Sequence, residues 1–239
     1  MNDFYKLYSI GKNTKKPYSR GKSFGYQVLG FGSGVNSAIA HRAVWAGNFL
    51  ADSSPSNIID FVEIATLGNA TDFGDQSVAR HRLNSSSASS TRGIWFGGNT
   101  QPTRTNIIDY VTIATQGNAT DFGDTSVLSQ HGGSAGNDTR AVHNIGDQSD
   151  NSVNILEYVT IANTGNTTDF GDLTSSANDT SGASSNKIRG VMAKGGTPNR
   201  SANIDYITIA TTGNAADFGD RTVEATYGGC CSNGNGGLA

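Results

Sequence analysis

The stretch Asn106–Asp124 reads Asn-Ile-Ile-Asp-Tyr-Val-Thr-Ile-Ala-Thr-Gln-Gly-Asn-Ala-Thr-Asp-Phe-Gly-Asp, and the chain of 239 residues contains four similar copies of it. Two aromatic positions step along the chain by 49, 48 and 48 residues. They are Phe61, Tyr110, Tyr158 and Tyr206 for the first, and Phe73, Phe122, Phe170 and Phe218 for the second. A fixed period of about 40 to 50 residues predicts a repeat architecture and is typical of the blades of a β-propeller.

The pattern inside this stretch predicts a β-strand followed by a turn. Between Ile107 and Ala114, branched aliphatic residues alternate with Tyr, Thr and Ala, and a period of two is typical of a strand. Both faces are largely apolar, which suits a blade packed between neighbours better than a sheet with one wet face. Gly117-Asn118 is a turn signal that ends the strand.

A second element, a short strand that begins with arginine and ends in glycine, precedes each copy. Its four copies lie at 42–47, 92–98, 140–146 and 189–196. Ser232–Gly237 resembles a fifth copy of this element, and Asp3–Ile10 resembles a fifth copy of the Asn-Ile-Ile-Asp strand. We therefore expect one all-β propeller of five blades, closed into a ring by a blade that the two chain ends share, with four or six blades as alternatives.

The first 22 residues differ from the rest of the chain. They carry six basic residues and one acid, whereas residues 23–239 carry 11 basic residues and 19 acids. We interpret residues 1–22 as a basic arm that includes the ring-closing strand, and residues 23–239 as the propeller repeats. The arm is either a solvated terminus or a docking segment for an acidic neighbour. It lacks the apolar run of a secretory signal peptide.

The composition agrees with an all-β repeat protein. The chain has 31 glycines, 4 prolines, 35% hydrophobic and 15% charged residues, which favours turns and strands over helices. The formal net charge of -3 is too small to indicate a nucleic-acid partner. No segment approaches the length of an apolar membrane span, so we expect no membrane insertion.

Several residues of the repeat resemble the kelch repeat. They are Gly97-Gly98 at the end of one strand, Asp109-Tyr110 in the next and Arg140 before the following strand. Kelch repeats usually carry a tryptophan after the tyrosine, where this chain has Phe122. Over Arg42–Ala239 the chain is similar to kelch-like repeat proteins of tailed bacteriophages. This resemblance implies a tail or other virion structural protein, and it supplies no catalytic residues.

The repeated Asp-Phe-Gly-Asp segment suggests two further chemistries. Asp-Phe-Gly is the metal-binding triplet of protein kinases, but the sequence lacks the other kinase motifs. Asn118, Asp121 and Asp124 could gather oxygen ligands for calcium. We favour a structural role, in which these side chains accept hydrogen bonds from backbone amides of a repeated turn. We therefore expect no metal and no cofactor.

The histidines and cysteines show no ligand pattern. His41, His81, His131 and His143 lack the spacing of metal ligands. Cys230 and Cys231 are adjacent and are expected to be reduced thiols, because a disulfide between neighbours distorts the peptide. The chain has no other cysteine, which suits synthesis in a bacterial cytoplasm.

Recognition in a repeat protein falls to the segments that differ between repeats. These segments are rich in Ser, Asn, Gly and Thr, which can hydrogen-bond to sugar hydroxyls, and lie at 83–91, 99–105, 130–139, 147–153 and 173–187. One position of the strand that begins with arginine also changes residue type between repeats: it holds Trp45, Trp95, His143 and Met192. We take as candidate ligand-binding residues Trp45, Trp95, His131 and His143. For the strand position itself we favour packing between blades over a ligand-binding role.

We therefore expect a non-enzymatic structural protein of a tailed bacteriophage, located in the tail, a fibre or the capsid surface. Its expected partners are other virion proteins, in several copies per particle, and a glycan on the host surface. One alternative is a carbohydrate-active propeller enzyme, which would need two carboxylates about 5 to 9.5 Å apart. The other is a free lectin.

Overall fold

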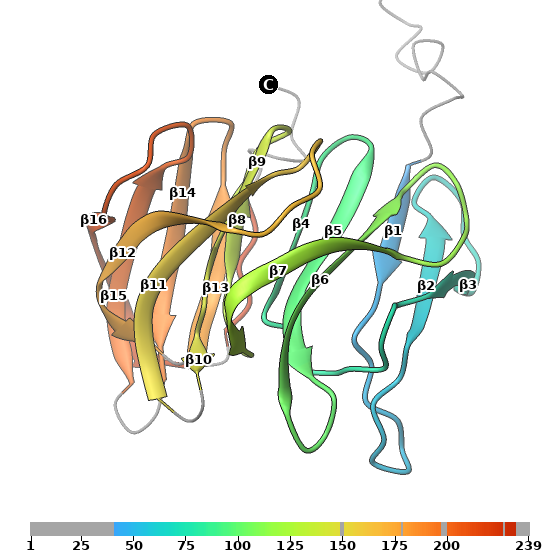
Figure 1. The fold of residues 1–239 in the computed structure, drawn as a ribbon. Coiled ribbons are helices and arrows are strands. Elements are labelled where there is room, and N and C mark those ends of the chain that lie inside the picture. The colour runs from blue at the N-terminus through green and yellow to red at the C-terminus, as the bar shows by residue number, and fades with distance from the viewer. Residues whose placement is uncertain (1–40, 149–150, 178, 197–199, 227, 233–239) are drawn as a thin grey trace, which may run out of the picture. The chain divides into compact units, whose positions relative to one another are not determined.

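The computed structural model describes residues 41–148, 151–177, 179–196, 200–226 and 228–232. These residues form strands and no helix, and the strands make four antiparallel sheets in chain order (Figure 1). The all-β prediction is confirmed. The described residues show no closure of the four sheets into a ring. The expected arm 1–22, its strand Asp3–Ile10 and most of Ser232–Gly237 lie outside them.

The first sheet holds β1 (Arg42–Trp45), β2 (Ile58–Glu63) and β3 (Thr71–Asp75). The second holds β4 (Ser85–Ala88), β5 (Arg92–Asn99), β6 (Arg104–Thr112) and β7 (Thr120–Ser129). The third holds β8 (Ser134–Gly136), β9 (Arg140–Asn144), β10 (Asp147–Gln148), β11 (Asn151–Thr160) and β12 (Thr168–Ala177). The fourth holds β13 (Asp179–Ser185), β14 (Arg189–Gly195), β15 (Ser201–Thr208) and β16 (Ala216–Ala225).

The quoted stretch forms a hairpin of β6 and β7, with Tyr110 opposite Thr120. The predicted strand is confirmed, but it ends at Thr112, where the Thr115 N–H donates to the Thr112 carbonyl, and Gly117-Asn118 lies in the loop that follows. The turn expected at Asp-Phe-Gly-Asp is wrong, because these residues lie in β7. Asp121 Oδ1 does accept a hydrogen bond from the Gly123 N–H at 3.1 Å, within that strand. The strands that begin with arginine, β1, β5, β9 and β14, each pair with the repeated strand.

The two aromatic markers of each repeat meet in space. Their rings lie edge to face, with centroids 5.7 to 6.1 Å apart in all four sheets. The arginine that begins the neighbouring strand lies over the first aromatic ring at 4.1 to 4.7 Å. The same Arg–aromatic–Phe stack therefore forms four times. Equivalent residues of successive stacks lie about 48 positions apart in the sequence.

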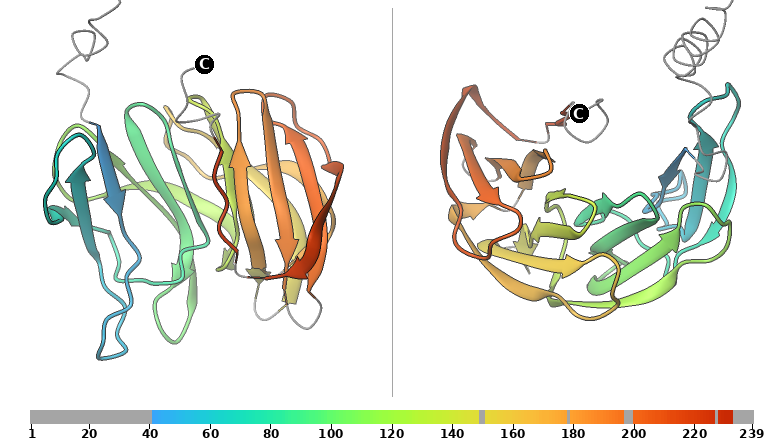
Figure 2. Two further views of the ribbon diagram at one scale, coloured as in Figure 1. Left: turned by 180° about the vertical axis from the view of Figure 1, so that it is seen from behind. Right: turned by 90° about the horizontal axis from the view of Figure 1, so that it is seen from above.

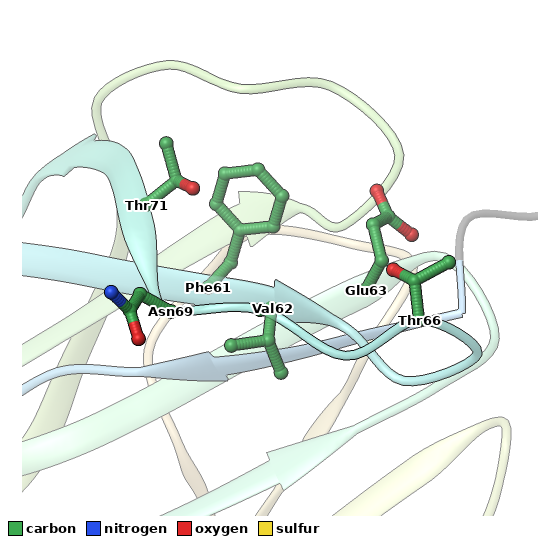
Figure 3. Close-up of a pocket in the computed structure, with 7 residues that line it drawn as sticks. Phe61, Val62, Glu63, Thr66, Asn69 and Thr71 are labelled. Carbon is green, nitrogen blue, oxygen red and sulfur yellow. The ribbon is translucent and has the colours of Figure 1, made fainter.

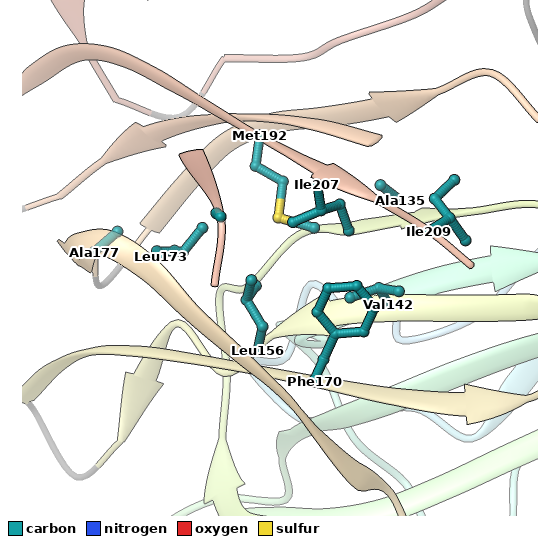
Figure 4. Close-up of a cluster of buried hydrophobic side chains, with 10 residues drawn as sticks. Ala135, Val142, Leu156, Phe170, Leu173, Ala177, Met192, Ile207 and Ile209 are labelled. Carbon is teal, nitrogen blue, oxygen red and sulfur yellow. The ribbon is translucent and has the colours of Figure 1, made fainter. Parts of the chain in front are cut away.

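The hydrophobic core is divided into three clusters, each between two consecutive sheets. Phe73 of the first sheet and Trp95 of the second share one cluster, and Phe122 and Val159 share the next. The third cluster joins the third and fourth sheets (Figure 4) and contains Ala135, Val142, Leu156, Phe170, Leu173, Ala177, Met192, Ile207, Ile209 and Ala215. Each sheet therefore buries its apolar faces against its neighbours in the chain.

Consecutive sheets are also hydrogen-bonded to each other, through what we call the turn–strand contact. Gly117 N–H donates to the Phe73 carbonyl at 2.8 Å, and Ala119 N–H donates to the Asp75 carbonyl at 2.8 Å. In return, Asp75 N–H donates to Asn118 Oδ1 at 3.1 Å. The same three bonds recur between the second and third sheets and between the third and fourth. Figure 2 shows the four sheets from two further sides.

The turn–strand contact requires glycine at the centre of the strand segment. A Cβ on Gly123 would lie 2.4 Å from the backbone of Gly165 in the next sheet. Gly74 and Gly171 meet the following turn at 2.4 and 2.5 Å in the same way. All three have a positive φ, which a side chain rarely adopts. The glycine of Asp-Phe-Gly-Asp is therefore set by the close approach of the next sheet.

Comparing Gly123→Ala with Gly117→Ala should isolate this close approach. Both residues have a φ near 150° (143° and 153°), but nothing lies within 4 Å of a Cβ on Gly117. We expect Gly117→Ala to lower the free energy of unfolding by about 1–3 kcal/mol, the cost of the strained backbone alone. Gly123→Ala should cost clearly more, because it also separates two sheets. Equal losses in urea unfolding would mean that the approach contributes nothing.

Candidate functional site

The residue before the first aromatic marker is acidic in every repeat: Asp60, Asp109, Glu157 and Asp205. The last three carboxylates bond to the preceding sheet. Asp109 accepts from Ser77 N–H at 3.1 Å, Glu157 from Ser126 N–H at 3.3 Å, and Asp205 from Thr174 N–H at 2.9 Å. These acids therefore link consecutive sheets as the turn–strand contact does.

Each of these three carboxylates also faces a cationic or titratable group. Arg80 Nη2 lies 2.9 Å from Asp109, and both side chains are fully buried. Lys194 Nζ lies 3.2 Å from Asp205, and His143 Nε2 lies 3.6 Å from Glu157. The three partners occupy different places in the repeat, so the acids recur and their partners do not. A buried carboxylate that bonds to a neighbouring sheet and faces such a side chain has a structural role.

Burial and local hydrogen bonds shift the pKa of two of these groups. Burial lowers the pKa of Arg80, and the Asp109 carboxylate offsets part of that shift. Burial raises the pKa of Glu157, but hydrogen bonds and the charge of His143 outweigh it and lower the pKa to about 2. At 3.6 Å the distance from His143 Nε2 to Glu157 is longer than an ordinary hydrogen bond, whereas the Thr167 hydroxyl donates directly to Glu157 at 2.7 Å.

A second polar assembly, which we call the polar cluster, lies outside the repeated residues. Arg104 Nη2 and Gln130 Nε2 both approach Asp147 Oδ2, at 2.8 and 3.1 Å. Asn99 Nδ2 donates to Gln130 Oε1 at 3.2 Å, and His131 Nδ1 lies 3.3 Å from Asp179 Oδ1. The members are Asn99, Arg104, Gln130, His131, Asp147 and Asp179. They come from the predicted variable segments of the second, third and fourth sheets.

The polar cluster is partly open to solvent. His131 is 30% exposed and Arg104 is 16% exposed, whereas Asp179 is 7% exposed. Burial lowers the pKa of His131, and Asp179 partly offsets this, so the imidazole is mostly neutral near pH 7. An amide, an imidazole and a guanidinium at one surface offer hydrogen bonds to a polar ligand such as a sugar.

The four candidate ligand-binding residues do not form one site. Trp95 is 5% exposed and packs between the first two sheets, beside Phe61 and Phe73. His143 is fully buried and stacks on Phe96, with centroids 4.3 Å apart. Only Trp45, which is 48% exposed, and His131 present surface to solvent. At the strand position that changes residue type, Trp95 and His143 are buried by packing, which is the role favoured for this position from the sequence.

A shallow pocket of about 200 Å³ lies on the first sheet (Figure 3), lined by Phe61, Val62, Glu63, Thr66, Gly68, Asn69 and Thr71. The corresponding residues of the second sheet, Tyr110 to Thr120, line a similar hollow of about 300 Å³. Because the hollow recurs with the repeat, we attribute it to the hairpin and not to a dedicated ligand. Sequence patterns alone did not single out either the pocket or Arg80, Arg104 and Lys194.

The calcium alternative considered for Asn118, Asp121 and Asp124 is not assembled in the described residues. Asn118 reaches across to the first sheet, while Asp121 bonds within its own strand. Within the described ranges, no three His, Cys, Asp or Glu side chains gather as metal ligands. No helix in this part of the chain is long and apolar enough to cross a membrane.

Replacing Arg80 should show the structural role of the buried pair. Arg80→Ala leaves Asp109 buried without its cation, so we expect a loss of about 3–5 kcal/mol in the free energy of unfolding. Glu63→Gln, which removes an ion pair whose acid is 43% exposed, should cost at most about 1 kcal/mol. Similar small losses in urea unfolding for both variants would contradict the assignment.

Glu157 should make stability depend on pH in acid. Its folded pKa of about 2 lies below the ordinary value of 4.5, so its contribution is present above pH 4.5 and is lost as pH falls toward 2. We expect Glu157→Gln to lower Tm at pH 6 and to flatten the decline of Tm between pH 5 and pH 2. The Tm of each variant, measured by circular dichroism across this range, tests the assignment, and parallel curves would contradict it.

Comparison with known proteins assigns no family to the chain. No protein-family model matches it, and no curated protein is detectably similar to it. The repeat and its contacts are therefore the basis for any functional proposal.

Proposed function

We propose that this protein is a non-enzymatic structural component of a tailed-bacteriophage virion, built as a kelch-like β-propeller. The proposal places it in the tail, a fibre or the capsid surface, after synthesis in the cytoplasm of the host bacterium. The observation that carries this proposal is that the repeated residues have structural roles. Three of the four repeated acids bond to the preceding sheet, and the repeated Phe and Gly of the first three sheets pack against the next one, as expected of a scaffold.

The kelch resemblance rests on residues that have clear structural roles. Gly97-Gly98 lies near the end of β5, and Asp109-Tyr110 lies within β6. Arg140 begins β9, lies over the Tyr158 ring and donates to the Ile209 carbonyl of the next sheet at 3.0 Å. Phe122, in place of the kelch tryptophan, fills the core between the second and third sheets.

We propose five sheets of this kind, closed into a ring by a fifth sheet that the two chain ends share. Three features of the described residues support it: antiparallel sheets of three to five strands, their contacts in chain order, and a core between each pair. Closure would remove the exposed faces of the first and fourth sheets.

The rival enzyme function has less support. A glycosidase needs two carboxylates that face a common substrate, one of them protonated. Here Asp109, Glu157 and Asp205 are buried and accept hydrogen bonds from the preceding sheet. Host-glycan binding, in contrast, has a specific candidate in the polar cluster, whose residues do not recur in the repeat and of which Asn99, Arg104 and His131 are partly exposed.

Localisation in purified particles tests the proposed function. Antibodies against the purified chain should label one structure in tailed particles from the source of the gene, and mass spectrometry of these particles should find the chain in several copies. We expect the chain alone to release no sugar from a panel of bacterial surface glycans. Sugar release abolished by one Asp or Glu substitution would favour the enzyme, and absence from the particles would favour the free lectin.

A further inference from the structure

The polar cluster lies at one end of the sheets, where the hairpin loops of the first two sheets and β10 are found (Figure 1). Backbone bridges join neighbouring segments at this end, one between His81 and Asn99 and one between Gln130 and Asp147. Through these bridges, segments of the first three repeats meet beside the polar cluster. The side chains that border the cluster therefore decide what it can bind.

An exposed aromatic ring borders the polar cluster. Phe49 lies against the His81 ring, with centroids 4.4 Å apart, and is 49% exposed, whereas His81 is 3% exposed. The loop that carries Phe49 is closed by the Ser56 N–H, which donates to the Asn48 carbonyl at 3.0 Å. The corresponding segments of the other repeats contain no aromatic residue: 99–105, 147–153 and 196–202. An exposed ring of this kind offers an apolar surface to a flat ligand.

Arg82 places a positive charge beside this ring. It follows His81 directly and is exposed. Burial lowers the pKa of both His81 and His131, and the charge of Arg82 lowers both further, so the guanidinium lies near both imidazoles. Among the described residues, no carboxylate forms an ion pair with Arg82, whereas Arg104 is paired with Asp147 at 2.8 Å.

Two residues of this end have a strained backbone. Arg82 has a φ of 46° and His131 has a φ of 64°, a region that residues other than glycine rarely adopt. Such strain persists only where the surrounding structure holds it, and it is concentrated at binding and catalytic sites. The two strained residues are also the two whose side chains bring a guanidinium and an imidazole to the surface beside the polar cluster.

We propose that this end of the sheets binds a sugar ring that carries one carboxylate, such as a uronic acid unit of a surface glycan. The inference rests on the host-glycan binding proposed above and names the class of sugar. The Arg82 guanidinium donates two hydrogen bonds to the carboxylate, a geometry for which its planar fork is suited. Phe49 contacts the apolar face of the ring, and Asn99 and His131 bond to its hydroxyls.

The charges at this end favour a carboxylate over a phosphate. Asp147 neutralises Arg104, Asp179 is buried, and Asp52 accepts hydrogen bonds within its own loop. Arg82 is therefore the cation of the described residues here that is left for a ligand. It matches the single charge of a carboxylate, whereas a phosphate monoester carries about −1.5 to −2 at pH 7.

Calorimetric titration of the purified full chain tests the proposal. The probes are oligomers of galacturonate, glucuronate, mannuronate and sialate, each compared with the same oligomer after reduction of its carboxylates to alcohols. We expect at least one acidic oligomer to bind, and its reduced form to bind about tenfold more weakly or worse, the loss typical of a charge-assisted hydrogen bond. Arg82→Gln should weaken binding of the acidic form by a similar factor and leave the reduced form unchanged.

Phe49→Ala should weaken the acidic and the reduced form by the same factor, because the ring contacts the sugar and not its charge. Two matched controls should leave both dissociation constants unchanged. Lys187→Gln removes the same charge from the turn between β13 and β14, at the other end of these strands. Leu67→Ala removes a fully exposed apolar side chain from the first sheet. Circular dichroism should give all four variants the Tm of the unchanged chain, because all four side chains are substantially exposed.

The possible outcomes separate this inference from the proposed function. Equal binding of the acidic and reduced forms would overturn the carboxylate assignment and leave glycan binding in place. Binding of neither form by any oligomer would count against both. Dextran sulfate that binds as tightly as the best oligomer, with no effect of Phe49→Ala, would show a general attraction to polyanions and overturn the inference. None of these results depends on whether the chain is found in phage particles.

Discussion

The turn–strand contact is the interaction on which the arrangement of the described sheets depends. Its backbone hydrogen bonds join sheets that share no strand, and they require a glycine where the next turn approaches. The core clusters add non-directional burial between the same sheets. The contact supplies the direction and spacing that apolar packing alone does not, since hydrogen bonds tolerate little misalignment.

Repetition of this contact explains why the repeated residues are so uniform. Asn118, Asn166 and Asn214 each accept a hydrogen bond from the sheet before them, and each preceding Phe-Gly-Asp meets a turn of the sheet after it. A substitution in one repeat therefore disturbs two sheets. The residues that vary between repeats do not have to fit both neighbouring sheets in this way. The polar cluster is made of such variable residues.

The buried ion pairs show how a repeat accommodates irregular residues. Arg80 occupies a position at which the next two repeats have the small residues Ser129 and Ala177. Its guanidinium neutralises Asp109, whereas Asp205 is neutralised by Lys194 from a different strand. Buried charge must be compensated locally, but the compensation can come from any neighbour within reach. The acid therefore recurs in each repeat while its partner changes.

The sequence by itself determined the all-β class, the repeat period and a strand predicted at 107–114, most of which lies in β6, because these depend on local alternation and turn residues. It did not reveal that Asp-Phe-Gly-Asp is a strand. It also did not bring Arg104 and Asp147 together, 43 positions apart. Those outcomes were decided by the tertiary structure, because contacts between sheets override local preference and join residues whose spacing no short pattern records.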